Sequence, residues 1–353
     1  MTRHELALKK LHEGTVIPAN PLALDENRKF DEKRQRALCR YYLDCGVGGL
    51  AVAVHTTQFE IRKPEHNLLE PVLRIAKEEA SEFEKKAGEV IVMVAGACGP
   101  MEQAVKEAAL AKSLGYDAVL LSPGGLNHLS EEELIERTKA VAEVLPVIGF
   151  YLQTAVGGRH FSYDYWTKIA EIPGVVAIKA APFNRYYSYD VVRAVAFSSR
   201  RDDITLYTGN DDNIVLDLVT KYKFNINGEV YEKGFIGGLL GHWSVWTKTA
   251  VDLFNKLKEV RESESISPEI LTLAAEVTDT NAVFFDTANN FKGCIAGLHE
   301  VLRRQGLLRG IWCLDPNETM SDGQAEEIDR IYKAYPHLND DEYIKANLDK
   351  WLA

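Results

Sequence analysis

The chain has 353 residues, of which 46% are hydrophobic and 26% are charged. This balance is typical of a globular protein and excludes a disordered or low-complexity chain. Its 41 Lys and Arg residues against 52 Asp and Glu give a net charge of -11. Because the basic residues are scattered, we expect neither nucleic acid nor a membrane surface as a partner.

No targeting or membrane-spanning segment is expected in this sequence. Residues 1–14 carry charges every few positions, where a signal peptide needs an apolar run. The apolar stretch Val90–Cys98 is far shorter than the roughly 18 residues that span a bilayer. The five cysteines form no CxxC pair, so we expect reduced core residues without a metal or disulfide role. These features predict a cytoplasmic protein.

Short apolar runs alternate with stretches of helical period, the pattern of a parallel sheet with crossover helices. The predicted strands, in chain order, are Thr15–Pro18, Gly49–Val54, Val90–Ala95, Ala118–Ser122, Val147–Tyr151, Val175–Lys179, Thr205–Thr208 and Phe235–Leu239. The predicted helices between and after them are Asp31–Asp44, Asn67–Lys86, Met101–Leu114, Glu131–Val144, Tyr163–Glu171, Tyr189–Phe197, Asn213–Tyr222 and Ser244–Val260. Asp31 and Ser130 are expected N-caps. Eight such pairs predict an α/β fold, a (β/α)8 TIM barrel over residues 1–260.

After residue 260 the strands stop and only helical segments follow. The predicted helices are Pro268–Thr278, Asn281–Arg304, Gln324–Tyr335 and Asp341–Trp351. The runs Val283–Phe285 and Ile295–Leu302 are too apolar for a free tail. We therefore expect residues 261–353 to form a C-terminal helical extension packed on the barrel.

The carboxyl ends of the strands carry the chemistry in such barrels, and Lys179 ends the sixth predicted strand. Burial lowers the pKa of a lysine, and a neutral amine can attack a ketone to form a Schiff base. The alternative is a strand-end lysine that reaches solvent or pairs with a carboxylate. Periodicity by itself does not decide between the two.

Three other strand ends carry candidate polar groups. Tyr151 ends the fifth strand, where a phenol near a protonated imine is able to move protons, and packing is its alternative role. Thr56 and Thr57 follow the second strand and offer hydroxyls and amides to a carboxylate. His55 beside them is either a base or a structural residue. Gly237 and Gly238 in the eighth strand leave room for a carboxylate or a phosphate.

Two further motifs do not fit their usual context. The run Gly46–Ala51 has dinucleotide-type GxGxxA spacing, but it follows a helix and precedes a strand, the reverse of what that site needs. The run Gly209–Asn213 begins like a calcium loop, yet no glutamate follows at the required distance. We expect this second run to cap a helix.

Together these positions resemble the dihydrodipicolinate synthase / N-acetylneuraminate lyase family of Schiff-base class I aldolases, as a divergent member. The matching motifs, in the family's order, are Asn20-Pro21-Leu22, Val54–Thr57, Phe150-Tyr151, Ala177–Lys179, Gly209–Asp212, Gly237–Gly241 and Phe291-Lys292. The resemblance covers almost the whole chain and implies a (β/α)8 barrel with a helical extension.

The resemblance also implies roles for individual residues. Lys179 would form the imine with pyruvate or another 2-oxo acid, and Tyr151, hydrogen-bonded by Thr56, would move protons. Thr57 would hold the substrate carboxylate by its side chain and backbone amide. The substrate-binding set predicted in this way is Thr57, His55, Arg159, Gly209, Gly237 and Gly238.

Some positions depart from the family pattern. Dihydrodipicolinate synthases carry Pro-Tyr-Tyr after the fourth strand, and this chain has Pro123-Gly124-Gly125, without the tyrosine lent to the neighbouring subunit. Their arginine after the fifth strand comes earlier than Arg159. These departures argue against synthesis of dihydrodipicolinate itself.

The predicted function is a lyase that makes or breaks a bond in a 2-oxo acid by aldol cleavage or condensation. The alternatives are a dehydratase of a 2-keto-deoxy sugar acid that uses the same Schiff base, a binding barrel without turnover, and a phosphate-ester enzyme. The imine lysine is itself the electron sink, so no cofactor and no metal are expected. The resemblance implies a homodimer or a homotetramer.

Overall fold

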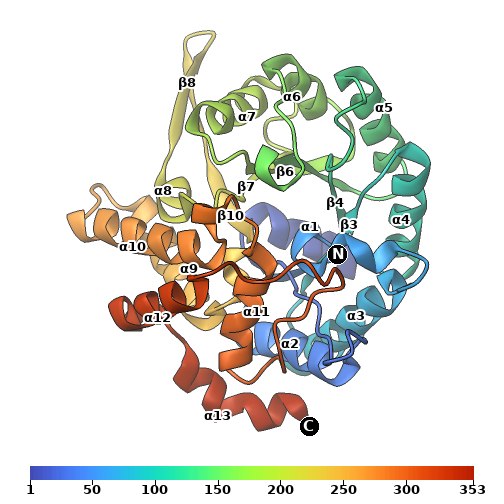
Figure 1. Cartoon of the computed structure of the whole chain (residues 1–353). Helices are drawn as coiled ribbons and strands as arrows, with labels where there is room; N and C mark the ends of the chain where they lie inside the picture. The colour runs from blue at the N-terminus through green and yellow to red at the C-terminus, as the bar shows by residue number, and fades with distance from the viewer. The chain divides into compact units, whose positions relative to one another are not determined.

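The computed structural model describes residues 1–353. Eight parallel strands build a (β/α)8 barrel, and C-terminal helices follow it (Figure 1). By its contacts the chain divides into two compact units. Unit 1 comprises residues 1–15, 92–239 and 257–266, and unit 2 comprises residues 16–91, 240–256 and 267–353. None of the helices combines the length and apolarity that a membrane crossing needs.

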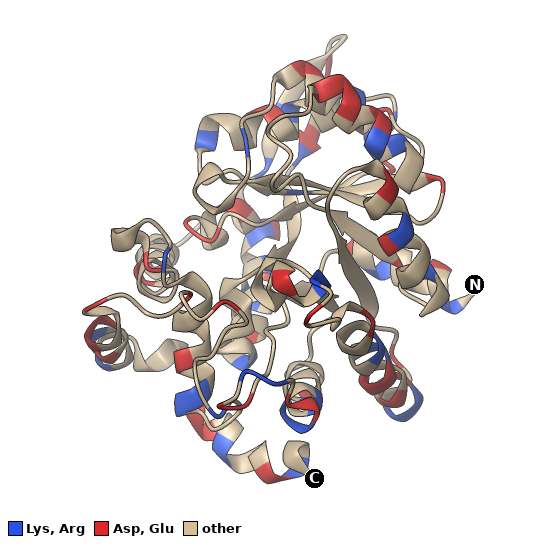
Figure 2. Ribbon diagram, turned by 45° about the vertical axis from the view of Figure 1, so that its right-hand side comes forward, with Lys and Arg blue, Asp and Glu red and all other residues tan.

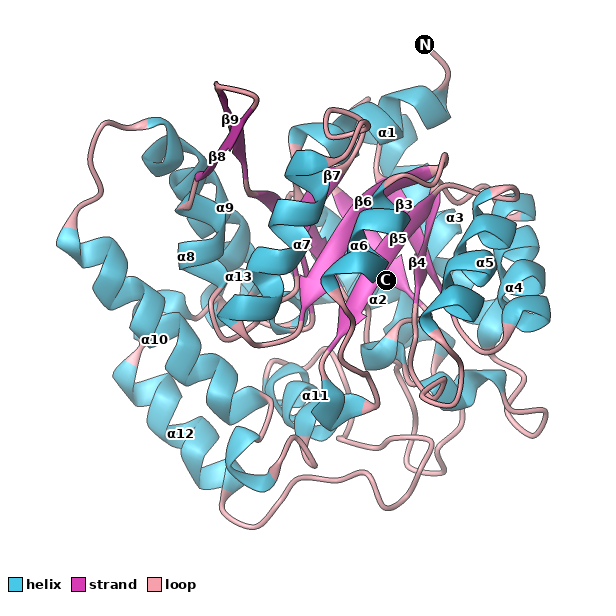
Figure 3. Cartoon of the chain, turned by 90° about the horizontal axis from the view of Figure 1, so that it is seen from above, coloured by secondary structure: helices cyan, strands magenta, loops and turns pink.

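Unit 1 contains six adjacent parallel strands. In spatial order they are β3 (Val92–Ala97), β4 (Ala118–Leu121), β5 (Val147–Leu152), β6 (Val175–Ala181), β7 (Thr205–Thr208) and β10 (Phe235–Leu240). Their residues are almost all buried, as expected for strands covered on both faces. The helices of this unit are α1 (Arg3–Glu13), α4 (Met101–Ser113), α5 (Glu131–Ala142), α6 (Tyr163–Ala170), α7 (Arg185–Phe197) and α8 (Ile214–Val219). Figure 3 shows α4 and α5 beside β4, and α6 in front of β5 and β6.

An antiparallel hairpin is inserted between α8 and β10. Its strands are β8 (Tyr222–Ile226) and β9 (Glu229–Lys233), joined by Asn227 and Gly228, both at positive φ. The Asn-Gly pair suits such a two-residue turn. Figures 1 and 3 show the hairpin projecting from its neighbours in unit 1. Neither strand is among those predicted from the sequence.

Unit 2 begins with β1 (Val16–Pro18), which lies beside β2 (Gly49–Val52). Its helices are α2 (Glu32–Asp44), α3 (Leu69–Ala87), most of α9 (Thr247–Glu262), α10 (Pro268–Phe284), α11 (Cys294–Arg304), α12 (Gln324–Ala334) and α13 (Asp341–Leu352). The helices of the C-terminal extension thus share a unit with two barrel strands. The predicted domain boundary at residue 260 stays a prediction.

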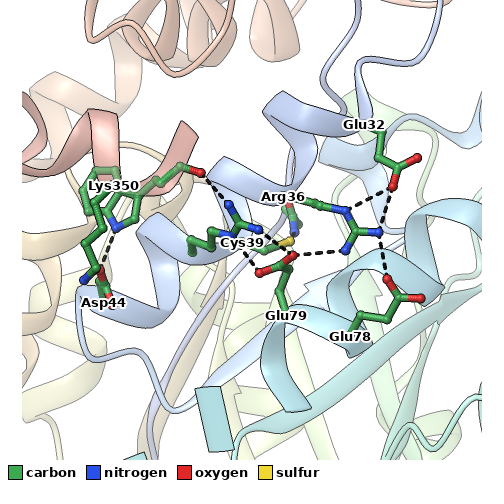
Figure 4. Close-up of polar contacts among 10 residues, drawn as sticks. Glu32, Arg36, Cys39, Asp44, Glu78, Glu79 and Lys350 are labelled. Carbon is green, nitrogen blue, oxygen red and sulfur yellow. Dashed lines mark hydrogen bonds and ion pairs between the residues drawn. The ribbon is translucent and has the colours of Figure 1, made fainter. Parts of the chain in front are cut away.

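The last helix, α13, packs on α2. The Trp351 ring centre lies 5.3 Å from that of Tyr41, and its indole Nε1 donates to Asp44 Oδ2 at 2.6 Å. Arg40 of α2 donates to the Trp351 carbonyl at 2.9 Å, and Arg36 joins α2 to α3 through Glu79 at 3.0 Å (Figure 4). Acidic and basic positions are interspersed along the helices (Figure 2). Exposed pairs of this kind contribute little stability individually, so the buried indole is the main anchor.

All eight predicted strands are present, and two expected caps are confirmed. The Asp31 side chain accepts from Arg34 N, and Ser130 forms a capping box with Glu133. Asn213 stands at the N-cap of α8, but its side chain makes no cap hydrogen bond and donates to Asp217 instead. The expected cap is therefore not formed by that side chain.

The predicted single helix Asn281–Arg304 is wrong. The structure ends α10 at Phe284 and starts α11 at Cys294. Asp286 lies at φ 54°, and its carboxylate accepts from Gly293 N at 2.9 Å and from Asn289 Nδ2 at 2.7 Å. Such short-range side-chain bonds compete with the helix and favour a turn.

Candidate active site

Lys179 lies in β6 with a side chain that is only 8% exposed. Burial lowers its pKa to about 8, and the negative charge of Asp211 acts in the opposite direction. Its Nζ lies 4.4 Å from the centre of the Phe150 ring, and it makes no hydrogen bond or ion pair within the structure. A substantial fraction of this amine is therefore neutral near physiological pH and uncommitted to any protein acceptor.

Gly209, the residue after β7, makes room for the lysine. A Cβ at this position would lie 2.3 Å from Lys179 Cε and 2.9 Å from Ala181 Cβ. Both distances are shorter than van der Waals contact allows, so no side chain fits here unless the lysine moves. From the family resemblance, Gly209 is expected to contact the substrate. The structure gives it a contact with the lysine stem.

The register of β5 and β6 sets which side chains share a face with Lys179. Phe150 is the residue paired with Lys179, and Tyr151 is paired with Ala180. Successive residues of a strand point to opposite faces. A Cβ at Gly149 would contact Ile169 of α6, so Gly149 and Tyr151 face the helices. Lys179 and Phe150 therefore face the barrel interior together.

Tyr151 is packed in an aromatic cluster on the helix side of β5. Its ring stacks on Trp166 at 5.3 Å and meets Phe161 edge-on at 5.5 Å. Its hydroxyl accepts a hydrogen bond from Phe161 N at 3.3 Å, and burial raises its pKa to about 12. This placement corrects the expectation that Tyr151 adjoins Lys179, because a shift of one residue along a strand reverses the face.

A buried carboxylate, Asp217 of α8, holds the loop that follows β7. Asp217 Oδ2 accepts from Thr208 Oγ1 at 2.7 Å and from Asn210 Nδ2 at 2.8 Å. Its Oδ1 accepts from Arg185 Nη1 at 2.7 Å. These bonds fix the backbone on both sides of Gly209, and thus the wall beside Lys179. Asp217 is not predicted from the sequence, because it lies in an apolar run without a motif.

In unit 2, residues His55–Thr57 form a single 3-10 turn after β2. Thr57 Oγ1 donates to the Asn20 carbonyl at 2.7 Å, and Thr57 N donates to the Val54 carbonyl at 3.0 Å. Both donors that we expected to hold a carboxylate are therefore used within unit 2. The buried Thr56 hydroxyl makes no hydrogen bond in the structure, and His55 packs edge-on against Phe59 at 6.0 Å.

The remaining predicted residues make structural contacts. Arg159 donates to the Leu129 carbonyl, and its guanidinium lies over the Phe161 ring. A Cβ at Gly237 would lie 2.5 Å from the Tyr207 ring and 2.8 Å from the Thr15 backbone. Gly238 donates to the Thr15 carbonyl at 3.2 Å. Both glycines thus serve close packing, and no contact joins them or Arg159 to Lys179.

The comparison with protein families identifies the family of this chain. The model of the dihydrodipicolinate synthetase family matches residues 13–222. This chain belongs to that family. The match includes the lysine strand and the loop that carries Gly209.

Curated relatives share a low identity with the chain. It is 26% identical over 210 residues to a 4-hydroxy-tetrahydrodipicolinate synthase of Desulforudis audaxviator, covering 58% of this chain. It is 23% identical over 274 residues to the synthase of that name from Clostridium novyi, covering 76% of this chain. The first alignment spans 66% of the relative's length, just under two thirds, and the second spans 83%.

Solved structures support the same fold. The N-acetylneuraminate lyase from Fusobacterium nucleatum superposes with a TM-score of 0.71 at 18% identity, over 92% of this chain and 99% of its own. The dihydrodipicolinate synthase from Oceanobacillus iheyensis superposes with a TM-score of 0.75 at 17% identity, over 95% of this chain and 100% of its own. At these identities the likeness establishes the fold.

Proposed function

We propose that this protein is a lyase of the class I aldolase type that acts on a 2-oxo acid through an imine on Lys179. The observation that carries the proposal is the buried lysine whose pKa is lowered to about 8 and whose amine has no partner in the protein. The names of the relatives, synthases and lyases of one family, support it.

In the proposed reaction the neutral amine attacks the ketone carbon, and the carbinolamine then loses water to give a protonated imine. This imine withdraws electrons from the neighbouring carbon, which then loses a proton or a carbon substituent to give an enamine. Addition of the enamine to an aldehyde forms a carbon–carbon bond, and expulsion of a hydroxide with a proton eliminates water. Aldol chemistry and dehydration therefore begin at the same intermediate.

The proposal does not use Tyr151 as the proton carrier, because its hydroxyl binds Phe161 N on the other face of β5. The interior neighbour at that level of the barrel is Phe150, which has no proton to give. We infer that water or a substrate group exchanges the proton at the imine. The catalytic assignment of Thr56, the assignment of Thr57, His55 and Arg159 to substrate binding, and the homodimer or homotetramer stay predictions.

The decisive experiment is reductive trapping. The protein is incubated with pyruvate and sodium borohydride, digested, and its peptides are weighed by mass spectrometry. A reduced adduct is expected on the Lys179 peptide and on no other lysine. Lys179→Met should abolish the adduct while circular dichroism stays native. An unmodified Lys179 peptide in folded protein would overturn the proposal, and a screen of aldehydes and keto-deoxy acids would then be pointless.

A further inference from the structure

Unit 1 contains a cavity of about 240 Å³ at the opposite end of β7 from Gly209. Its charged and polar wall residues are His12, Asp202, Thr205, Glu232, Lys233 and Arg261. They come from the end of α1, the start of β7, the end of β9 and the end of α9. Four residue steps of about 3.3 Å separate Thr205 from Gly209, so this cavity is well separated from the lysine amine.

The cations of this wall are bound to neutral carbonyls. Lys233 Nζ donates to the Arg201 carbonyl, and Arg261 Nη1 donates to the Phe235 carbonyl. Neither forms an ion pair with a carboxylate. Glu232 on the same wall is paired with Lys223, at 3.2 Å. The exposed Asp202 is thus the one wall carboxylate that is not committed to a basic side chain.

His12 adds a third basic group to the wall. Its Nδ1 lies 2.6 Å from Thr205 Oγ1, and its Nε2 has no hydrogen-bond partner in the structure. Burial lowers the pKa of His12, of Lys233 and of Arg261, and the charge of Lys233 lowers that of His12 further. Asp203 acts on His12, and Asp202 on Lys233, in the opposite direction. A bound anion would stabilise the charged form of all three groups.

We propose that this cavity binds a small dianion, a phosphate or a short dicarboxylate, between Lys233 and Arg261, with His12 as a further donor. Phosphate and carboxylate oxygens accept the charge-assisted bonds that guanidinium and ammonium groups donate. The inserted hairpin supplies Lys233, so the site depends on the part of unit 1 that the barrel pattern does not require. It stands independently of the chemistry at Lys179.

Calorimetric titration tests the proposal. Inorganic phosphate and malonate are titrated separately into the full chain, and saturable binding of at least one is expected. Lys233→Met should weaken that binding by about ten-fold or more, the effect of losing one charge-assisted contact. The matched control is Lys139→Met in α5, an exposed lysine whose partner Glu136 also lies outside the cavity, and it should change the affinity by less than about two-fold.

Each outcome decides one question. Binding of phosphate without malonate identifies a phosphoryl group, and the reverse identifies a dicarboxylate. Lys179→Ala should bind the anion as the unaltered protein does, so this site and the imine chemistry fail or succeed separately. Absence of saturable binding up to tens of millimolar, or equal affinity in Lys233→Met with native circular dichroism, would overturn the proposal.

Discussion

Lys179 and Lys233 both lie in unit 1, and burial lowers the pKa of both. The contacts of their side-chain amines differ. Lys179 ends beside an aromatic ring, where no protein acceptor binds its amine. Lys233 donates to the Arg201 carbonyl and shares its wall with an arginine and a histidine.

The difference separates a nucleophile from an anchored cation. An amine that attacks a carbonyl needs a free electron pair and room to move, which the contacts of Lys179 provide. An ammonium held by a carbonyl is fixed in place, and because its basic neighbours disfavour its charge, a bound anion would stabilise the charged form. Burial by itself therefore does not identify a reactive lysine. The contacts of its Nζ atom must be known as well.

The largest contrast should come from removing each lysine in turn. Lys179→Met is expected to lower kcat by at least about a thousand-fold, because the covalent step is lost. Lys233→Met should leave borohydride trapping by pyruvate within about two-fold of the unaltered protein, because its side chain touches no reacting atom. The measurement is adduct mass together with turnover. Equal losses of adduct and turnover in the two variants would contradict the assignment of Lys179 as the nucleophile and Lys233 as an anion-binding residue.

Gly209→Ala should reduce imine formation by about a hundred-fold, since the new Cβ would displace the Lys179 stem and misplace the amine. Gly149→Ala is the matched control on β5, the strand beside that of Lys179, where a Cβ would meet only ordinary contacts of 3.4 Å or more. Rapid-quench trapping measures the rate in each. If the two variants trap pyruvate equally fast, the reactivity of Lys179 does not depend on the space at Gly209.

The pH profile should report the lowered pKa of Lys179. Because the neutral amine attacks, the rate of pyruvate trapping should rise about ten-fold per pH unit below pH 8 and level off above it. Asp211 raises this pKa, so Asp211→Asn should move the midpoint to lower pH and speed trapping at pH 7. Asp212→Asn beside it is the control. A midpoint near 10.5 would mean that the lysine is not desolvated.

The smallest effect is expected at Tyr151. Tyr151→Phe should leave trapping unchanged and lower the free energy of unfolding by about 1 kcal/mol, because Phe161 N loses its acceptor. Chemical denaturation and trapping measure the two quantities. A drop of a hundred-fold or more in kcat with native stability would instead restore the proton-carrier role that the sequence predicts.

The barrel strands were predictable because each is an apolar run bounded by turn residues, and Lys179 was conspicuous as a charge at the end of one such run. The face of Tyr151 was not predictable in the same way. Tyr151 and Phe150 are adjacent aromatic residues, and the choice between them depends on the register of β5 against β6, which long-range pairing determines.

The inserted hairpin and Asp217 could not be predicted from the sequence, for two different reasons. The hairpin is not predicted, although its Asn227-Gly228 turn is a strong local signal, because its strands are mostly exposed or half-buried and lack a continuous apolar run. Asp217 is not predicted because a single carboxylate within an apolar helix belongs to no motif with a characteristic residue spacing. Three of its four side-chain partners, Thr208, Asn210 and Arg185, meet it only in the folded chain.

The inserted hairpin also bears on how such a protein changes over evolutionary time. It lengthens the connection between α8 and β10 without removing a barrel strand, and it contributes Lys233 to a wall far from Lys179. Insertions and deletions in this connection can therefore create or erase the anion cavity while selection keeps the lysine chemistry constant. Relatives of this chain should then differ in anion binding at this cavity while they share the imine chemistry of the lysine.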